Sequence, residues 1–314
     1  IKYNVLKWSK KQLDGAMNQK EASLAYSMLF GDKTLLDGKV KDNFSETGLA
    51  HVLAVSGLHV GFISLLVGFI LKRIIKNKWV YSSVLVTILI GYAYLCGFSA
   101  SIVRAIIMSA MLMIAQNLGD QYDGLNALGF AGLVNFIINP LCVFNVGFLL
   151  SFIVVLSILG FAPPIKYHLE KRMPAKTASA IAVAISAWLG GILISLFYFK
   201  KITLLSSIFN LLLIPSISII FMILMVALLI SLIPILGEVI LGVPEILLKG
   251  LNKLVELLAT LHESTLRLPL IYFSLVVGMV GMIIATDYVF IRKKWAYAGV
   301  LTIGVVLVSL VANI

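Results

Sequence analysis

The chain has 314 residues, of which 61% are hydrophobic and 12% charged, whereas soluble domains are about half apolar and a quarter charged. The mean hydropathy of +1.05 excludes a soluble globular protein, and separate apolar runs of about 20 residues indicate helices rather than a β-barrel. The net charge of +11 indicates first of all basic cytoplasmic loops, because such loops of membrane proteins are rich in Lys and Arg.

Residues 1–47 are polar and mixed in charge, with apolar residues near helical spacing between Leu13 and Leu29 and a helix stop at Gly31. This pattern predicts an amphipathic helix that lies on the membrane surface or packs on the helix bundle. We expect residues 48–314 to form the membrane domain. Apolar runs predict spans at 49–71, 79–97, 101–118, 125–139, 144–162, 178–199, 268–290 and 295–313.

Two further segments precede the last two spans. Residues 202–237 are too long for one upright span and contain Pro215 and Pro234, which predicts either one long kinked helix or a hairpin. Residues 238–264 carry charges near one helical face, which predicts either a span beside a water-filled path or a surface helix. The predicted fold is an all-α polytopic membrane protein. We expect roughly 8–10 hydrophobic helices, some kinked, broken or re-entrant, with one or two amphipathic interfacial helices.

Three basic loops predict the orientation. Loops 72–78, 163–177 and 292–294 hold eleven lysines and arginines against one acid, Glu170. Because cytoplasmic loops are enriched in Lys and Arg, we expect these three loops in the cytoplasm. The N-terminal segment and the C-terminus are then expected outside.

The stretch HVLAVSGLHVGF interrupts the first predicted span with polar and helix-weakening residues. One interpretation is packing, since Gly57 and Gly61 form a GxxxG motif that lets a neighbouring backbone approach closely. The other is a broken or cavity-facing helix in which His51, Ser56 and His59 stay hydrated. A hydrolase or metal site is disfavoured, because Ser56 is not in a GxSxG motif and the sequence lacks HExxH.

Arg104 lies a few residues into the third predicted span, shortly after Ser99 and Ser101. An arginine well inside a span costs roughly 2.5–3.5 kcal/mol on insertion scales. Its side chain therefore either snorkels to the outer surface or faces a cavity, where it attracts an anion beside the two hydroxyl groups.

Amides and prolines recur in the later spans. Asn139 and Pro140 stop the fourth predicted span, and Asn210 precedes Pro215 by five residues. A helix broken at that proline leaves carbonyl groups that an amide can satisfy. The sequence has no Walker A motif, which excludes nucleotide hydrolysis by that route.

Several of these motifs resemble those of the ComEC competence proteins. The resemblance begins with EASLAYSMLFGDK and continues through Thr47-Gly48-Leu49, His51 and Ser56-Gly57-Leu58-His59. It extends through GFSASIVRAIIM, which contains Ser101, Arg104 and Ala105, and ends near NLLLIPSIS. Between these lie the matching residues Asn126, Asn139-Pro140, Gly147-Phe148 and Ser151-Phe152.

The resemblance implies import of single-stranded DNA across the bacterial plasma membrane in natural transformation. It implies an extracellular DNA receptor and a cytoplasmic helicase-like ATPase as partners. Family members commonly carry an oligonucleotide-binding-fold domain before this region and a metallo-β-lactamase-like nuclease domain after it. We expect both domains to be missing from this chain, which lacks an HxHxDH motif. We therefore expect a channel domain in the lipid bilayer that is not an enzyme and holds no metal or cofactor.

A path for single-stranded DNA needs positive potential, hydrogen-bond donors and faces for the bases. The residues expected to line or shape this path are His51, Ser56, Gly57, His59, Ser99, Ser101 and Arg104. Those expected to supply supporting polar groups or helix breaks are Asn126, Asn139, Pro140, Ser151, Asn210 and Pro215. The alternative functions are a small-solute or lipid-intermediate transporter, or a membrane anchor for extracellular DNA-processing domains.

Overall fold

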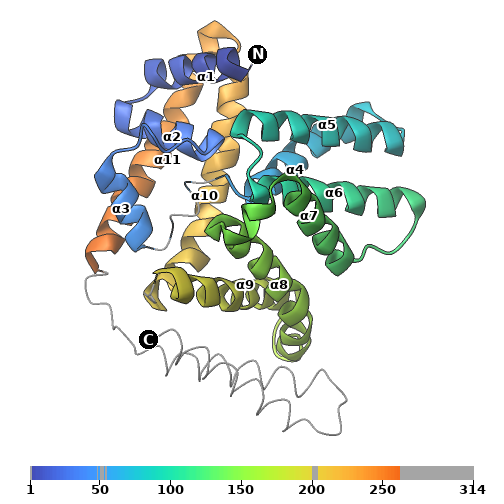
Figure 1. The fold of residues 1–314 in the computed structure, drawn as a ribbon. Coiled ribbons are helices and arrows are strands. Elements are labelled where there is room, and N and C mark those ends of the chain that lie inside the picture. The colour runs from blue at the N-terminus through green and yellow to red at the C-terminus, as the bar shows by residue number, and fades with distance from the viewer. Residues whose placement is uncertain (1, 48, 50–52, 54, 200–203, 262–314) are drawn as a thin grey trace, which may run out of the picture. The chain divides into compact units, whose positions relative to one another are not determined.

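Every element in the part of the chain that the structure describes is helical (Figure 1). The computed structural model describes residues 2–47, 49, 53, 55–199 and 204–261. One compact unit holds α1–α7 with α10 and α11, and a second unit holds α8 and α9. The predicted spans 268–290 and 295–313 and the basic loop 292–294 lie outside the described residues.

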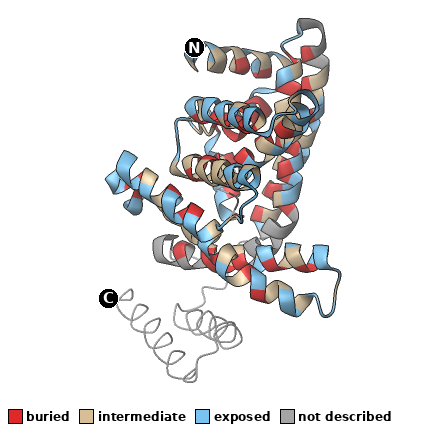
Figure 2. Cartoon of the chain, turned by 90° about the vertical axis from the view of Figure 1, so that its right-hand side faces the viewer, coloured by how far each residue is buried: buried red, intermediate tan, exposed pale blue. Residues whose placement is uncertain are grey.

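Five described helices are long and apolar enough to cross a membrane. They are α4 (Gly57–Ile74), α5 (Lys78–Cys96), α6 (Ala100–Leu118), α8 (Val146–Leu169) and the Leu213–Ile230 part of α10 (Leu204–Ile230). Figure 2 shows buried residues along one face of many helices and exposed residues along the other. Many of the exposed side chains on these helices are large and apolar, as lipid contact requires. The predicted all-α polytopic membrane protein is confirmed.

The N-terminal segment contains three helices, α1 (Lys2–Ala16), α2 (Gln19–Phe30) and α3 (Gly38–Glu46). Of the two predicted placements, packing on the bundle is correct for α2, which is buried from Glu21 to Phe30 except at Ser23. Gly31 ends α2 at φ +78°, as predicted. A Cβ atom there would lie 3.2 Å from Val55 Cγ2, so this position needs glycine for both its backbone angle and its space.

Hydrogen bonds between α2 and other elements fix its position. The Tyr92 hydroxyl of α5 donates to the Leu29 carbonyl oxygen over 2.8 Å, and the Ser27 hydroxyl donates to the Leu53 carbonyl oxygen over 3.1 Å. Both bonds are buried, where an unpaired polar group is costly. They join α2 to α5 and to the segment that leads into α4.

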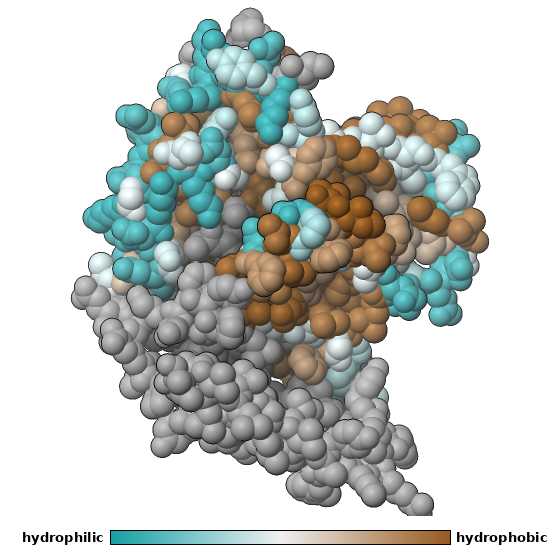
Figure 3. Space-filling view, in the orientation of Figure 1, coloured by the Kyte–Doolittle hydropathy of each residue, from teal (hydrophilic) through white to brown (hydrophobic). Residues whose placement is uncertain are grey.

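The helix α11 (Pro234–Leu261) packs against α1, α2 and α3 (Figure 1). The Glu245 carboxylate accepts hydrogen bonds from the backbone N–H and side-chain amide of Asn18 at 3.2 and 2.9 Å. Lys39 of α3 and Glu256 of α11 form an ion pair at 2.6 Å. A hydrogen bond from Lys249, and next one from the Asn18 backbone, lower the pKa of Glu245. Figure 3 shows a mostly hydrophilic surface over α1–α3.

Of the two alternatives for residues 202–237, the long helix is correct. The helix α10 runs unbroken through Pro215 to Ile230, so the segment does not fold back there, and the helix break expected at Pro215 is wrong. Leu213, Ile217 and Phe221 of α10 are buried in the core, and this packing outweighs the loss of one backbone hydrogen bond at the proline. The chain reverses at residues 231–233, and Pro234 begins α11 at the first helical position, where a missing N–H has no cost.

The first predicted span begins too early. The structure starts α4 at Gly57 rather than at residue 49, because Ser56 adopts an extended N-cap conformation. The next two predictions agree within two residues with α5 and α6. A third agrees equally well with α7 (Gly124–Ile138), whose C-cap is Asn139 and which is followed by a 3-10 helix at Pro140–Phe144.

The second unit is a pair of closely packed helices, α8 and α9 (Ala175–Phe199). A Cβ atom on Gly190 would lie 2.5 Å from Ser157 Oγ and 3.0 Å from the Ile153 carbonyl oxygen. Glycine therefore sets the distance between the two helices. The α8 helix also extends past the predicted end of its span at residue 162 through Pro163 and Pro164.

Candidate functional site

The start of α4 is held by its own first turn. The backbone N–H of Ser56 donates to His59 Nδ1 over 3.0 Å, and Ser56 Oγ lies 3.0 Å from the same nitrogen. His59 takes the place of the Glu or Gln of a usual capping box. Because an amide N–H can only donate, Nδ1 is the acceptor, and the proton of the neutral imidazole is on Nε2.

Two residues of α6 contact the same helix start. The Gly57 backbone N–H donates to Ser101 Oγ over 3.2 Å. A Cβ atom on Gly57 would lie 2.6 Å from Arg104 Nη2 and 3.3 Å from Ala105 Cβ. The absence of a side chain at Gly57 therefore makes room for the Arg104 guanidinium.

Arg104 is only 7% exposed, so its side chain packs within the protein and does not snorkel to the surface. The N-terminus of a helix carries a partial positive charge that favours anions. The guanidinium lies beside this end of α4, which makes the junction of α4 and α6 electropositive. Guanidinium groups and helix N-termini are both groups that hold phosphates and other anions in proteins.

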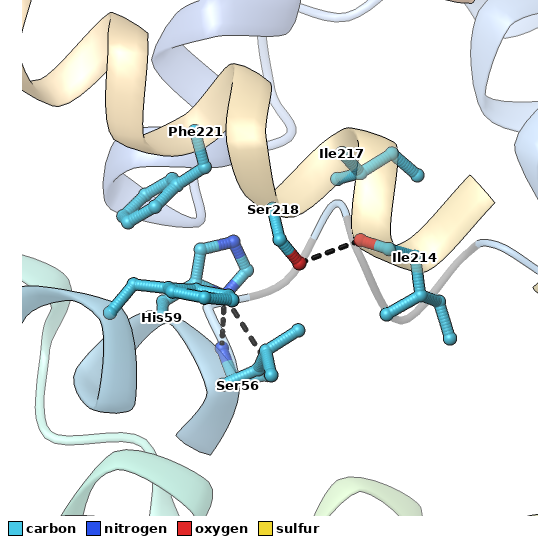
Figure 4. Close-up of a pocket in the computed structure, with 8 residues that line it drawn as sticks. Ser56, His59, Ile214, Ile217, Ser218 and Phe221 are labelled. Carbon is cyan, nitrogen blue, oxygen red and sulfur yellow. Dashed lines mark hydrogen bonds between the residues drawn. The ribbon is translucent and has the colours of Figure 1, made fainter. Parts of the chain in front are cut away.

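The helix α10 covers the opposite side of His59. The His59 and Phe221 rings meet edge to face, with centroids 4.4 Å apart. Figure 4 shows the imidazole turned toward α10, with the hydroxyl of Ser218 on the same side. That hydroxyl donates to the Ile214 carbonyl oxygen over 2.6 Å.

A cavity of about 20 Å³ separates these side chains. It is lined by Ser56, Leu58, His59, Phe62, Ile214, Ile217, Ser218 and Phe221. The volume is enough for one water molecule and far too small for a nucleotide. His59 therefore shapes the packing between α4 and α10 in this conformation.

The structure brings together Ser56, Gly57, His59, Ser101 and Arg104 from the predicted path residues. Ser99 is exposed at the N-cap of α6. His51 lies outside the described residues. The GxxxG interpretation holds only at its first glycine, because Gly61 is exposed and a Cβ atom there would have no atom within 4 Å among the described residues.

The predicted supporting residues are spread over several helices. Asn126 Nδ2 donates to Asp123 Oδ2 at the start of α7, and Asn139 Oδ1 accepts from the Leu141 backbone N–H beyond its end. Ser151 lies in α8, which belongs to the other compact unit. Asn210 lies within α10, and its side chain is not among those that the structure describes.

Sequence reasoning missed the side chains that α10 contributes, Ser218 and Phe221, because contacts more than 150 residues away have no local signal. It also missed Tyr94 and Phe98, which flank the glycine between α5 and α6. The sequence does contain a signal for these two residues, namely aromatic side chains on both sides of a glycine between two apolar runs. Within the described residues, no group of three His, Cys, Asp or Glu side chains could hold a metal ion.

The helical bundle and its electropositive junction define a polytopic membrane protein with a polar helix start inside its core. The model of the family described as "Competence protein" matches residues 28–293. Because this match covers most of the sequence, the chain belongs to the competence protein family.

Three curated proteins are similar to the chain. ComE operon protein 3 of Bacillus subtilis is 24% identical over 91% of this chain and 38% of its own length. Recombination protein 2 of Haemophilus influenzae is 30% identical over 45% of this chain and 18% of its own. Competence protein ComA of Neisseria gonorrhoeae is 25% identical over 66% and 30%. The chain thus spans well under half the length of these relatives. No solved structure matches the chain.

Proposed function

We propose that this chain is the membrane domain of a channel that imports single-stranded DNA across the bacterial plasma membrane during natural transformation. Membership of the competence protein family supports this proposal, and so do the names of two relatives, which refer to competence and recombination. In this proposal the chain works with an extracellular DNA receptor and a cytoplasmic helicase-like ATPase.

The observation that carries the proposal is the Arg104 guanidinium, buried beside the first turn of α4. Placing an arginine inside a candidate span is energetically costly, so an arginine at such a position indicates a function. DNA phosphates need a positive potential along their path, and few fixed charges let the strand move on after binding. Arg104 and Ser101 supply that potential and a hydroxyl group, while Ser56, Gly57 and His59 hold the helix start in place.

The proposed orientation puts the loops 72–78 and 163–177 in the cytoplasm and residues 1–47 outside, as the positive-inside rule favours. The C-terminus is proposed to lie outside as well. The turn between α5 and α6 is then external, because α5 begins at the cytoplasmic loop 72–78. Strands would reach the Arg104 cluster from that side.

The test compares DNA uptake in competent cells that carry the native gene, a deletion, Arg104→Leu or Arg104→Lys. Uptake is measured as end-labelled DNA that becomes protected from external nuclease. We expect the deletion to abolish protected single strands. Arg104→Leu should reduce them at least about tenfold at equal protein level, and Arg104→Lys should retain part of the uptake because the charge remains.

Each outcome has a distinct meaning. Uptake lost on deletion but normal in Arg104→Leu would leave the channel proposal in place and reduce Arg104 to a packing residue. Protected DNA that persists in the deletion strain would refute the channel proposal and favour a small-solute or lipid-intermediate transporter. Normal uptake with the membrane domain replaced by an unrelated anchor would favour a membrane anchor.

A further inference from the structure

An exposed aromatic and basic patch lies where α1 meets the turn between α5 and α6. Its members are Tyr94 and Phe98 at the turn with Lys2 of α1 over the Tyr94 ring, together with the neighbouring pair Tyr3 and Lys7 on α1. Tyr3, Tyr94 and Phe98 are 72%, 50% and 49% exposed. The Tyr94 and Phe98 rings meet edge to face with centroids 6.4 Å apart. We call these five residues the outer aromatic patch.

Each tyrosine of the patch carries a lysine over its ring. Lys2 Nζ lies 5.7 Å from the Tyr94 ring centroid, and Lys7 Nζ lies 5.8 Å from that of Tyr3. Lys2 comes from α1 and Tyr94 from α5, so this pair joins two helices that are far apart in sequence. Lys2 thereby holds a ring and a positive charge together where α1 meets α5, and Lys7 and Tyr3 form a second such pair within α1.

The sequence on both sides of the patch is basic or neutral. The first thirteen residues contain four lysines and no acidic residue. The end of α5 adds no acid, because its last turn and the turn after it are apolar, small or hydroxyl-bearing up to Arg104. Exposed rings beside lysines match the chemistry of a nucleic acid strand, which carries both negative phosphates and flat bases.

The backbone at Phe98 is unusual for its residue type. Phe98 has φ +51°, and it is the non-glycine residue with positive φ in the described part of the chain. A bulky side chain in this region costs of order 1–3 kcal/mol and persists where the surrounding structure imposes it. The turn thereby presents an exposed ring immediately before Ser99, the N-cap of α6.

We propose that the outer aromatic patch binds single-stranded nucleic acid, with bases stacked on Tyr94, Phe98 and Tyr3 and phosphates paired with Lys2 and Lys7. Bases of every type stack on aromatic faces, so binding is independent of sequence. The inference rests on the proposed function and adds a receiving surface to it. Continuity with α6 supports it, because Phe98 is six residues before Arg104 and at the same end of the helix.

Tyrosine and lysine are also common where a membrane protein meets the lipid headgroups. A headgroup contact needs amphipathic rings and basic side chains but gains nothing from base stacking. The two readings therefore predict different responses to removal of the bases from the ligand. Leu in place of the aromatic residues also separates them, because Leu keeps apolar volume and loses the ring face.

The experiment measures binding of fluorescein-labelled oligo(dT) to the chain in nanodiscs of phosphatidylcholine, a zwitterionic lipid. A strand of equal length made of abasic phosphates is the second probe. The variants are Tyr94→Leu with Phe98→Leu, and Lys2→Gln with Lys7→Gln. The matched control is Tyr167→Leu with Lys171→Gln, because Lys171 Nζ lies 4.7 Å from the exposed Tyr167 ring in the second unit.

We expect the aromatic variant to weaken oligo(dT) binding at least about fivefold, the lower end for one stacked base. The lysine variant should reduce the slope of log affinity against log salt by about 1.4, since each phosphate contact on a single strand contributes about 0.7. The control should bind as the native chain does, and the abasic strand should bind more weakly than oligo(dT).

Equal binding of both probes by the native chain would overturn the proposal, and so would an aromatic variant that binds oligo(dT) normally. Reduced reconstitution of that variant with unchanged binding would identify a headgroup contact instead. If the aromatic variant does not fold, photocrosslinking replaces it. The photoreactive p-benzoylphenylalanine introduced at position 98 should crosslink the labelled oligo(dT), and the same residue introduced at position 167 should not. Loss of uptake on deletion would keep the channel function even where the patch fails.

Discussion

Gly57→Ala tests the contact between α4 and Arg104 directly. The new methyl carbon would lie 2.6 Å from Arg104 Nη2 and 3.3 Å from Ala105 Cβ. The first separation is closer than a Cβ atom approaches another heavy atom, and the second needs a shift of a few tenths of an ångström between two helices. Overpacking of this kind costs about 1–3 kcal/mol. We expect a net loss of stability and a displaced guanidinium, and therefore reduced DNA uptake.

Gly61→Ala is the matched control, one turn further along α4. A Cβ atom there meets nothing within 4 Å among the described residues, so alanine should be neutral or stabilise by up to about 1 kcal/mol through helix propensity. The assay is the thermal unfolding midpoint of each purified variant in one detergent. Each kcal/mol corresponds to about 2–4 °C for a domain of 150–250 residues.

A double-mutant cycle identifies the clashing group. In an Arg104→Ala background, Gly57→Ala should lose most of its cost, with a coupling of at least about 0.5 kcal/mol. Equal midpoints for Gly57→Ala and Gly61→Ala would refute the close approach of α4 and α6. An unchanged cost without the guanidinium would assign the clash to Ala105 instead.

Three further substitutions or conditions test other contacts. Gly190→Ala puts a methyl carbon 2.5 Å from Ser157 Oγ, so we expect a lower unfolding midpoint and a loss of about 1–3 kcal/mol. Tyr92→Phe leaves the buried Leu29 carbonyl without its 2.8 Å donor and should cost about 1–3 kcal/mol, read as faster proteolysis within α2. Hydrogen bonds lower the pKa of Glu245 in the folded protein, so its ionised carboxylate stabilises the contact of α2 and α11. This stabilisation is complete above the usual Glu pKa of about 4.3, and stability should fall as the pH drops through the lower pKa of the folded protein.

Each of these has its own control. Gly191→Ala should be tolerated, because the nearest atom to its Cβ lies at 3.7 Å, and equal effects at both glycines would contradict the packing argument. Tyr94→Phe removes a hydroxyl from an exposed ring and should leave proteolysis within α2 unchanged. Glu245→Gln should make the unfolding midpoint depend less on pH between pH 7 and 4. A pH dependence as steep as that of the native chain would assign the titration to another group.

The apolar runs predicted the bounds of α5, α6 and α7 to within two residues, and the residues at these ends show why short stretches of sequence were sufficient. The side chains of Asn77 and Asp123 accept hydrogen bonds from the first-turn N–H groups of α5 and α7. Gly97 and Gly119 end α5 and α6 in the left-handed conformation. These residues act within one turn of themselves, so their effect can be read from short stretches of sequence.

The start of α4 shows where such signals fail. The Ser56 and His59 pair forms a cap in which His replaces the usual Glu or Gln, so the pattern is not recognised, and the apolar run before it suggests a longer span. The continuation of α10 through Pro215 depends on packing partners elsewhere in the chain. The same holds for the candidate site, where motifs identified α4 and α6 but gave no sign of Phe221.

The contact between Asn18 and Glu245 has a consequence for biosynthesis, because it joins residues 227 positions apart. At 5–20 residues per second, a ribosome needs roughly 11 to 45 s to make the intervening chain. During that time α2 has neither α10 nor α11 to cover its apolar surface. The nascent segment that contains α2 must therefore be kept from aggregating, by lipid or by a chaperone, until the last described helix of the bundle emerges.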